Sequence, residues 1–433
     1  MTFNSVEFAL FFLFVATCVT RLPRGQSRKV GLLLVSLFFY SLWNWKFSLL
    51  LILTAIIHWG AALVNHRWSM YGAVACSVAI LSVFKYLGLW IDSIVMPVGI
   101  SFYTFQAISY TVDVYKGRIE ARKSPLDVAL YVSFFPQLLS GPIVRADDFF
   151  QELEVYRSLS CERLSCGFGQ FSFGLFKKVF IADRMAPFVG KVFEGCNAFD
   201  GITLWVAAIS YTIQIYCDFS GYSDMAIGVA RALGFDYKKN FDHPYLSTSV
   251  TEFWRRWHIS LSTWLRDYVY IPLGGNRKGT FRQYLNQMIT MLIGGAWHGA
   301  DLSFVAWGGL HGAALCVHKW WRMKMRMPTA LAWLVTMVVV IYGWVLFRAI
   351  SFDQAWLFMK RMTSFAPGLS WLHPHVFIAL AMVVLGSVKF KGRYLSERCD
   401  VRTPFGLFMA LSAFLLAVVC PAGGANPFIY FNF

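Results

Sequence analysis

Apolar residues dominate this chain in long runs that polar residues seldom interrupt. Many of the runs are broken by glycine, proline or serine, and they cover residues 6–20, 30–45, 48–64, 71–90, 95–113, 126–140, 165–182, 202–217, 284–298, 303–318, 330–348, 376–388 and 405–420. A helix needs about 20 apolar residues to cross the hydrocarbon core of a bilayer, and several runs approach that length. The pattern predicts an all-α integral membrane protein with about 11 membrane segments, some of them re-entrant.

The composition agrees with a membrane setting. Hydrophobic residues make up 57% of the 433 residues and charged residues 14%, which leaves too few polar side chains to build a water-facing shell. No linker, low-complexity segment or internal repeat divides the chain, so we expect one domain over residues 1–433. The first apolar run has no basic region before it, and it is therefore expected to be a retained helix.

Lysine and arginine recur in clusters along the borders of the apolar runs, at residues 21–29, 116–123, 277–282, 319–326 and 389–402. The positive-inside rule places these clusters in the cytoplasm and both termini outside. The net charge of +16 does not indicate nucleic acid, because the basic residues are dispersed and no nucleic-acid motif accompanies them. Anionic headgroups of membrane lipids are the expected partner, with an acidic cofactor as the alternative.

Residues 294–312, GGAWHGADLSFVAWGGLHG, place His298 on the turn of an apolar hairpin. The apolar run from Gln283 to Trp297 would rise only about 22 Å as a helix, so His298 is expected inside the membrane. An imidazole exchanges a proton near neutral pH, and ionisable groups within a bilayer usually serve function. The segment favours proton-transfer chemistry at His298, although a packed histidine bonded to a carbonyl gives the same pattern. His311 is expected about 12 Å deeper, with a secondary part.

The segment Thr251–Gly275 carries aromatic and basic residues at helical spacing. Trp254, Trp257, His258, Leu261, Trp264, Leu265 and Tyr268 share one predicted face, while Arg255, Arg256, Thr263, Arg266 and Asp267 fall on the other. We expect one amphipathic helix at the cytoplasmic interface. Its arginines either anchor the helix to lipid headgroups or, with Lys278, receive the phosphates of an acidic cofactor. On the inward face, His258 is either structural or part of a site.

Two acidic residues, Asp218 and Asp224, are predicted to end or interrupt the apolar run 202–217. Such acids pair with a base, cap a helix or orient a histidine, while Ser220 and Ser223 are equally suited to cap a following helix. Other chemistry is disfavoured. The sequence has no GxSxG or HExxH motif, and its nine cysteines form no CxxC pair, so we expect buried thiols and no metal site.

Seven blocks of the sequence resemble the membrane-bound O-acyltransferase (MBOAT) family, and within it the bacterial alginate O-acetylation type. The resemblance is densest over residues 97–312. The blocks are PVGISFYTFQAISY from Pro97, FFPQLLSGPIVR from Phe134, GLFKKVFIAD from Gly174, DFSGYSDMAIG, HPYLSTSVTEFWRRWHISLSTWLRDYVYIPLGG, GGAWHGA and the terminal FIYFNF from Phe428.

The resemblance implies a helix bundle around a central tunnel, with interfacial and re-entrant helices on the cytoplasmic side. His298, in the WHG block, corresponds to the presumed catalytic residue of the family. His258, in the RWH block, corresponds to a second polar residue of the tunnel, and Trp297 lies beside His298 in sequence. A hydrogen-bond partner, His258 or Asp218, is expected to fix the tautomer of His298.

The resemblance also implies a function. Family members take an acyl group from a cytoplasmic donor, commonly acyl-CoA, and need no tightly bound cofactor. The expected activity is acetyl transfer across the bacterial inner membrane to an exported polysaccharide: alginate, cellulose or another exopolysaccharide. A periplasmic acetyltransferase of the SGNH-hydrolase-like class is expected to complete the transfer. D-alanyl transfer to teichoic acids and a non-catalytic export scaffold or channel are the alternatives.

Overall fold

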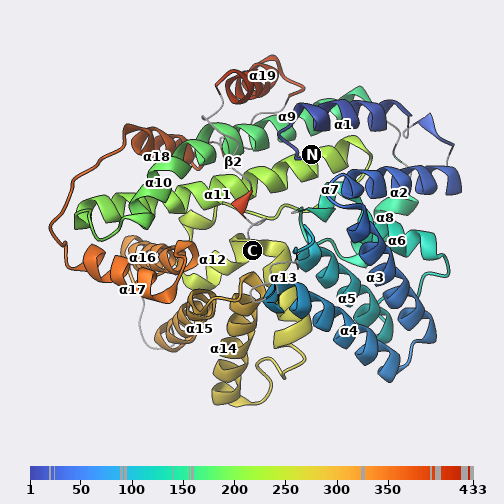
Figure 1. The fold of residues 1–433 in the computed structure, drawn as a ribbon, viewed down its shortest axis with the longest axis horizontal. Coiled ribbons are helices and arrows are strands. Elements are labelled where there is room, and N and C mark those ends of the chain that lie inside the picture. The colour runs from blue at the N-terminus through green and yellow to red at the C-terminus, as the bar shows by residue number, and fades with distance from the viewer. Residues whose placement is uncertain are drawn as a thin grey trace. The chain divides into compact units, whose positions relative to one another are not determined.

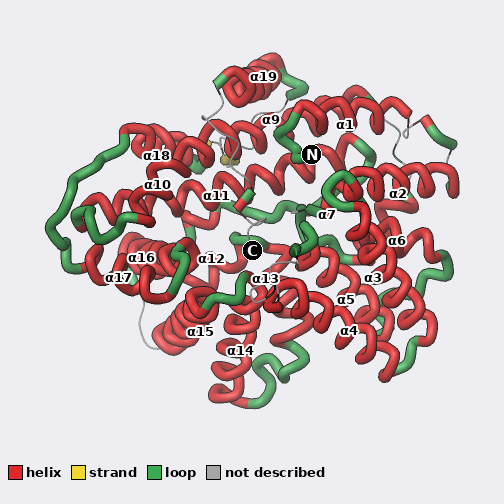
Figure 2. Tube along the Cα trace, viewed as in Figure 1, coloured by secondary structure: helices red, strands yellow, loops and turns green. Residues whose placement is uncertain are grey.

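The computed structural model describes the chain except for residues 19–20, 24, 88–90, 92–94, 140, 156, 158–159, 323–326, 391–392, 395–400, 421–427 and 430–433. The described residues are almost entirely helical (Figure 2), which confirms the expected helical class. A short antiparallel ladder joins β1 (Lys389–Phe390) to β2 (Arg393–Tyr394).

The chain forms two compact units, and unit 1 consists of Met1–Gly174, Tyr222–Lys239 and Val401–Ala410. Within this unit, α3 packs against α4, α5 and α6. Figure 1 shows its helices, which are α1 (Val6–Cys18), α2 (Gln26–Ser41), α3 (Trp45–Val64), α4 (Arg67–Tyr86), α5 (Ile100–Tyr115), α6 (Pro125–Ser133), α7 (Phe135–Leu138), α8 (Ala146–Glu154) and α9 (Cys161–Leu175).

A buried histidine joins three helices of unit 1. The Nδ1 atom of His58, in α3, lies 2.7 Å from the hydroxyl of Thr111 in α5, and its Nε2 atom lies 2.7 Å from the hydroxyl of Ser77 in α4. All three side chains are buried. The Thr111 hydroxyl also donates to the backbone carbonyl of His58 at 3.3 Å, so it accepts from Nδ1, and the Ser77 hydroxyl donates to Nε2.

Unit 2 consists of Leu175–Gly221, Asn240–Asp400 and Leu411–Phe433. Helices α11 (Gly201–Ala232) and α19 (Pro404–Val419) contribute residues to both units. The other elements of unit 2 are η3 (Phe176–Ala182), α10 (Asp183–Glu194), η4 (Pro244–Leu246), α12 (Val250–Arg256), α13 (Ile259–Leu265), η5 (Arg266–Tyr270), α14 (Gly279–His298), α15 (Leu302–Arg322), α16 (Thr329–Arg348), α17 (Phe352–Thr363) and α18 (Pro374–Gly386).

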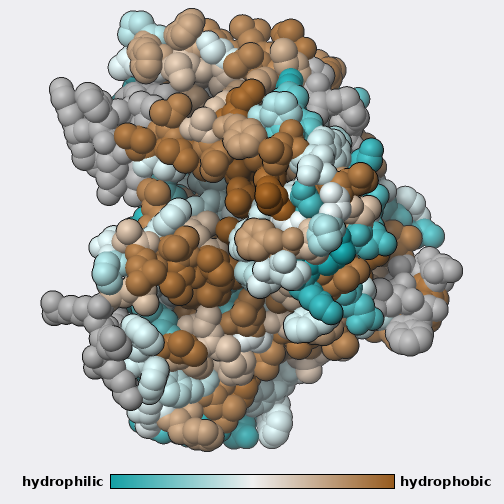
Figure 3. Space-filling model, turned by 90° about the vertical axis from the view of Figure 1, so that its left-hand side faces the viewer, coloured by the Kyte–Doolittle hydropathy of each residue, from teal (hydrophilic) through white to brown (hydrophobic). Residues whose placement is uncertain are grey.

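Among the described residues, four helices are long and apolar enough to cross a membrane: α3, α4, α11 and α16. Helices α1, α18 and α19 are apolar but shorter. Apolar side chains also cover much of the molecular face drawn in Figure 3. The chain therefore has the character of a membrane protein, while the count of about 11 segments and the single domain over residues 1–433 stay predictions.

Helix α11 corrects one sequence-based expectation. Asp218 and Asp224 do not end or interrupt it, because a single helix of 32 residues runs through both. Ser220 and Ser223 consequently lie inside this helix, where both are buried, and neither caps a following one. The sequence could not show that Asp218 has a buried cationic partner, which makes its position inside an apolar helix tolerable.

The segment Thr251–Gly275 is not the single helix that its spacing predicts. Helix α12 ends at Arg256 and α13 begins at Ile259, and between them His258 adopts a left-handed conformation with a φ of 40°. The predicted burial pattern nevertheless holds over most of the segment: Trp254, Trp257, His258, Leu261, Trp264 and Leu265 are buried, whereas Arg255 and Arg266 are exposed.

Asn240 explains the break after Arg256. Its side-chain oxygen accepts hydrogen bonds from the backbone N–H of Ser260 at 3.1 Å and from the Ser260 hydroxyl at 2.9 Å. Its carbonyl accepts the N–H of Ile259 at 2.9 Å, and the Asp242 N–H donates to the Arg256 carbonyl at 2.9 Å. These contacts satisfy backbone groups that a continuous helix would pair internally, so the break is stabilised from outside the segment.

Helices α14 and α15 pack closely as an antiparallel hairpin in unit 2. A Cβ atom on Gly295 would lie 2.3 Å from the carbonyl oxygen of Phe304, and one on Gly308 would lie 2.4 Å from that of Met291. The two backbones are therefore in direct contact, and only glycine fits at these positions. The tight hairpin places His298, the last residue of α14, beside the first turns of α15.

Candidate active site

His298 is buried, and a backbone carbonyl sets its tautomer. Its Nδ1 atom lies 2.6 Å from the carbonyl oxygen of Gly294, one helical turn earlier. A carbonyl oxygen only accepts hydrogen bonds, so Nδ1 carries the proton and Nε2 is the basic atom of the neutral ring. The acceptor at Nδ1 thus comes from α14 itself, while Asp218 pairs with Lys178.

Three aromatic rings surround the imidazole of His298. Its ring centroid lies 4.8 Å from those of Trp297 and Trp307 and 5.3 Å from that of Phe347, all in edge-on contacts. Apolar neighbours make a buried charge costly and so favour the neutral imidazole as the resting form. The arrangement is suited to a group that accepts a proton from a substrate and returns it.

Trp307 also contacts His311, at a centroid distance of 5.2 Å. One indole ring thus lies against both imidazoles, which brings them closer than the 12 Å that the helical rise predicts. Long side chains on a helix lean towards its N-terminus, and for α15 this is the end next to His298. His311 therefore belongs to the same cluster of rings as His298.

The imidazole of His311 is fully buried among aromatic rings and glycine. It lies 5.1 Å from Trp254 and 6.1 Å from Phe253 between centroids. Within the described residues neither of its nitrogens has a hydrogen-bond partner. A Cβ atom on Gly343 would lie 2.7 Å from His311 Nε2, so α16 can approach this ring only because residue 343 is glycine.

His258 joins the same group through Trp297, which lies 6.5 Å from His258 and 4.8 Å from His298 between ring centroids. The Nδ1 atom of His258 lies 3.3 Å from the side-chain oxygen of Asn240. Because that oxygen also accepts the Ser260 N–H, it is an acceptor, and His258 donates to it from Nδ1. The structure thus brings together His258, Trp297, His298 and His311, four residues singled out from the sequence.

Asp218 has a different role from the one predicted for a partner of His298. Its Oδ1 atom lies 2.6 Å from the ammonium of Lys178, which is also 2.7 Å from Asp183. Its Oδ2 atom accepts the backbone N–H of Ile429 at 2.9 Å. Of the three roles that the sequence left open, pairing with a base is the one observed. The carboxylate also anchors residues near the C-terminus.

Lys178 and Asp183 form an ion-pair cluster with Asp218 that the sequence analysis did not single out. Both belong to the GLFKKVFIAD block, and the π-helical turn η3 brings together residues five positions apart. That spacing escapes a search for ion pairs three or four residues apart on an α-helix. A usable signal did exist, since a lysine inside an apolar run is expected to have an acidic partner.

The three predicted donor-binding cations have unequal surroundings. Arg256 forms an ion pair with Glu252 at 2.7 Å and donates to the Asp242 carbonyl at 3.4 Å. Arg255 and Lys278 are exposed. The charge of Arg256 is therefore already paired within the protein, whereas the side chains of Arg255 and Lys278 are accessible from outside.

No cluster of three or more His, Cys, Asp or Glu side chains suited to a metal ion occurs in the described ranges. The eight cysteines within those ranges are free thiols, of which Cys196 and Cys217 are buried. Cys18 and Cys161 are exposed, which corrects the expectation of buried thiols at these two positions. Cys399 lies outside the described residues.

Comparison with known proteins gives consistent matches. Residues 37–359, which include His258, His298 and His311, match the model of the membrane-bound O-acyltransferase (MBOAT) family. The chain is 41% identical over 394 residues to the probable alginate O-acetylase AlgI of Pseudomonas aeruginosa, covering 84% of this chain and 75% of that protein. It is 37% identical to a peptidoglycan O-acetyltransferase of Helicobacter pylori, covering 80% and 75%. A teichoic acid D-alanyltransferase of Streptococcus thermophilus is 29% identical, covering 54% and 60%.

Proposed function

Since this chain belongs to the membrane-bound O-acyltransferase family, we propose that it moves an acetyl group from a cytoplasmic donor towards an exported polysaccharide. Relatives named for O-acetylation of alginate and peptidoglycan, at 41% and 37% identity, support acetyl as the acyl group. The observation that carries the proposal is the hydrogen bond from His298 to the Gly294 carbonyl, which leaves Nε2 as the basic atom.

In the proposed reaction, His298 is the general base. Nε2 takes the proton of the acceptor hydroxyl while the hydroxyl oxygen attacks the carbonyl carbon of a thioester donor such as acetyl-CoA. The C–S bond then breaks, and the departing thiolate receives the proton from His298. The Gly294 carbonyl stabilises the intermediate imidazolium through the Nδ1–H bond, and base catalysis of this kind contributes about 10²–10⁴-fold to a rate.

His258, His311 and Trp297 act as positioning residues in this proposal. Trp297 touches both His258 and His298, and Asn240 holds His258 at the break between α12 and α13. His311 packs against Trp307, which in turn packs against His298. Neither a metal ion nor a tightly bound cofactor takes part.

For the donor, Arg255 and Lys278 are the proposed phosphate ligands. Both side chains are exposed, whereas Arg256 is already paired with Glu252. Arginine and lysine bind phosphate through charge-assisted hydrogen bonds, which suits the acidic end of acyl-CoA.

We also propose a location and topology. The protein lies in the bacterial inner membrane among anionic lipids, with about 11 membrane segments around a tunnel, cytoplasmic basic clusters and periplasmic termini. Thiols introduced near Asn44 and Ser370 should react with an impermeant reagent from outside, and one near Arg277 only after permeabilisation. Lys324, a further cytoplasmic position, lies outside the described residues. The opposite pattern would overturn the cytoplasmic-donor mechanism.

The partner and polymer are part of the same proposal. A periplasmic acetyltransferase of the SGNH-hydrolase-like class receives the group and completes the transfer to the sugar. D-alanyl transfer to a teichoic acid is the second candidate, supported by relatives with 29% and 27% identity over little more than half of the chain.

Mass spectrometry of envelope polysaccharide tests these alternatives in a strain without the gene, complemented by the wild type or by His298→Ala. We expect acetyl esters to return with the wild type alone. Return of alanyl esters instead would favour the second candidate. Complementation by both genes would indicate a non-catalytic scaffold.

A further inference from the structure

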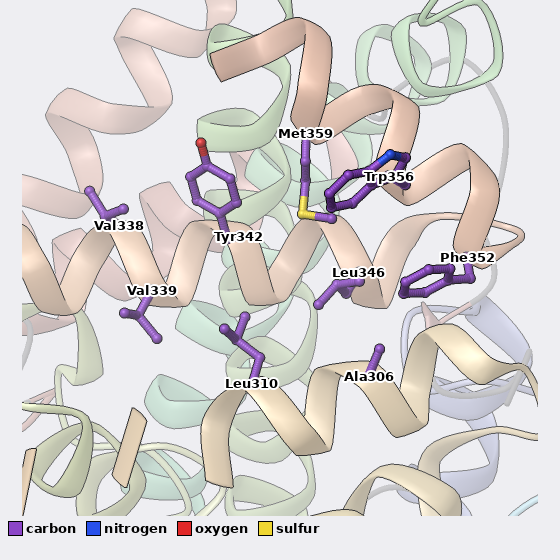
Figure 4. Close-up of a pocket in the computed structure, with 9 residues that line it drawn as sticks. All are labelled: Ala306, Leu310, Val338, Val339, Tyr342, Leu346, Phe352, Trp356 and Met359. Carbon is purple, nitrogen blue, oxygen red and sulfur yellow. The ribbon is translucent and has the colours of Figure 1, made fainter. Parts of the chain in front are cut away.

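Helices α15, α16 and α17 enclose an apolar surface groove of about 410 Å³, away from the histidine cluster. In Figure 4, α16 forms the floor, α15 lies along one side and α17 along the other. Ala306 and Leu310 line the groove from α15, Val339 and Leu346 from α16, and Phe352 and Trp356 from α17. Every one of these side chains is apolar or aromatic, so the groove favours a hydrocarbon occupant.

One end of this groove is polar. A second hollow of about 470 Å³ shares Tyr342, Trp356 and Met359 with the first and adds Lys360, Thr363 and Ser364. The hydroxyls of Tyr342 and Thr363 are 2.6 Å apart and hydrogen bonded at the junction. The two hollows together form one groove, with the ammonium of Lys360 at one end and hydrocarbon along the rest.

The groove lies where lipid is expected. Its floor, α16, is one of the four described helices that are long and apolar enough to cross a membrane. Trp356 is 61% exposed and stands at the junction with Tyr342. Tryptophan and tyrosine prefer the boundary between hydrocarbon and headgroups, and lysine extends its ammonium towards that boundary.

We propose that the groove binds one phospholipid with an anionic headgroup. An acyl chain lies along α16 between α15 and α17, and the phosphate meets the ammonium of Lys360, since the hydroxyls of Thr363 and Ser364 donate to the carbonyls of Met359 and Arg361. Among the residues that line the polar end there is one cation and no acid, which favours a negative charge. A helix of a partner protein offers an apolar face but no phosphate, whereas a phospholipid matches both ends.

The groove and the histidine cluster occupy different faces of α16. Leu346 lines the groove, while its neighbour Phe347 contacts His298. Lipid binding can therefore be tested with side chains that do not touch the proposed catalytic residues, and its outcome does not depend on the proposed acyltransfer.

The test uses the full chain, exchanged into nanodiscs of equal parts phosphatidylcholine and phosphatidylglycerol, extracted into mild detergent and weighed by native mass spectrometry. The wild type should retain phosphatidylglycerol. Ala306→Trp should fill the groove and lose the retained lipid, and Lys360→Glu should retain phosphatidylcholine in its place. Leu310→Phe is a second groove-filling variant for the case in which Ala306→Trp does not fold.

Two matched controls lie outside the groove. Leu334→Trp changes an exposed leucine of α16, and Lys46→Glu reverses an exposed lysine at the start of α3. Both should retain phosphatidylglycerol as the wild type does. Unchanged phosphatidylglycerol retention in the folded groove-filling variants or in Lys360→Glu would overturn the proposal, as would equal losses in the controls. Loss of a co-purifying membrane protein without loss of lipid would assign the groove to a helix instead.

Discussion

Two buried histidines of this chain differ in what accepts their hydrogen bonds. His58, in unit 1, contacts the hydroxyls of Thr111 and Ser77 at 2.7 Å each, whereas His298, in unit 2, donates to the Gly294 carbonyl at 2.6 Å among aromatic rings. The Thr111 hydroxyl also donates to the His58 backbone carbonyl at 3.3 Å, so both imidazoles donate from Nδ1, His58 to a hydroxyl and His298 to a carbonyl. The two rings differ at Nε2, which contacts the Ser77 hydroxyl in His58 and is the proposed base in His298.

Removing the imidazole of His298 should reduce activity more than any other change. His298→Ala should lower polymer acetylation by about 10²–10⁴-fold, because the proton acceptor is lost. Acetyl esters would be measured by mass spectrometry per amount of protein in the membrane. His298→Gln is the matched variant, since it keeps a polar side chain without a basic nitrogen, and it should fail equally. Near-normal acetylation by either variant would remove His298 from the chemistry.

The substitution His58→Leu should lower the free energy of unfolding and leave the activity of the folded protein unchanged. It leaves the buried Ser77 hydroxyl without this partner, at a cost of about 1–3 kcal/mol, while the Thr111 hydroxyl keeps its bond to the backbone carbonyl of residue 58. Thermal unfolding in detergent would show the loss, while acetylation per folded molecule should be preserved. Adding Ser77→Ala should recover most of the stability, because no unsatisfied hydroxyl then remains at this joint. A His58 variant that is stable but inactive would erase the contrast between the two histidines.

Two neighbouring arginines differ in whether they form an ion pair: Arg256 is paired with Glu252, whereas Arg255 is exposed. Arg255→Ala should raise the apparent KM for the acyl donor by roughly 10- to 150-fold, the equivalent of one charge-assisted hydrogen bond. Arg256→Ala should instead lower thermal stability, because Arg256 is paired with Glu252. Donor KM for both variants, in neutral and in anionic nanodiscs, decides the matter. Unchanged KM for Arg255→Ala in both lipids would exclude it from the donor site.

Changes around His311 should have the smallest effects, on stability and on activity. Gly343→Ala should destabilise the protein by about 1–3 kcal/mol, because the added methyl would lie 2.7 Å from His311 Nε2. His311→Ala should retain part of the acetylation activity. The double variant Gly343→Ala/His311→Ala should lose less stability than the sum of the two single losses, because removing the imidazole makes room for the methyl. Strict additivity in thermal unfolding would contradict this packing.

The sequence predicted what depends on local spacing. Burial of Trp254, Leu261 and Leu265 follows from their positions three and four residues apart, although the helix that carries them is broken. The break itself was not predictable, because Asn240 acts on it from 18 residues before His258. A single sequence does not show which distant side chain will satisfy an interrupted backbone.

Asp218 illustrates the same limit. Its neighbours allowed three roles, and the observed one depends on Lys178, which lies 40 residues earlier in the sequence, in η3. The acceptor of His298, by contrast, is local. Gly294 is four residues away in the same helix, and the sequence analysis had assigned a carbonyl partner only to the alternative in which His298 is structural. The hydrogen bond from His298 to the Gly294 carbonyl is compatible with the proposed role of His298 as a general base.

The contact between Gly295 and Gly308 also has a dynamic consequence. Helices whose backbones touch have no compressible side chains between them, so α14 and α15 are expected to move as one rigid body on the timescale of helix displacements. Lys278 precedes α14 and His298 ends it, about 30 Å away along the axis. A displacement of the hairpin near Lys278 on donor binding would therefore be a displacement of His298 as well.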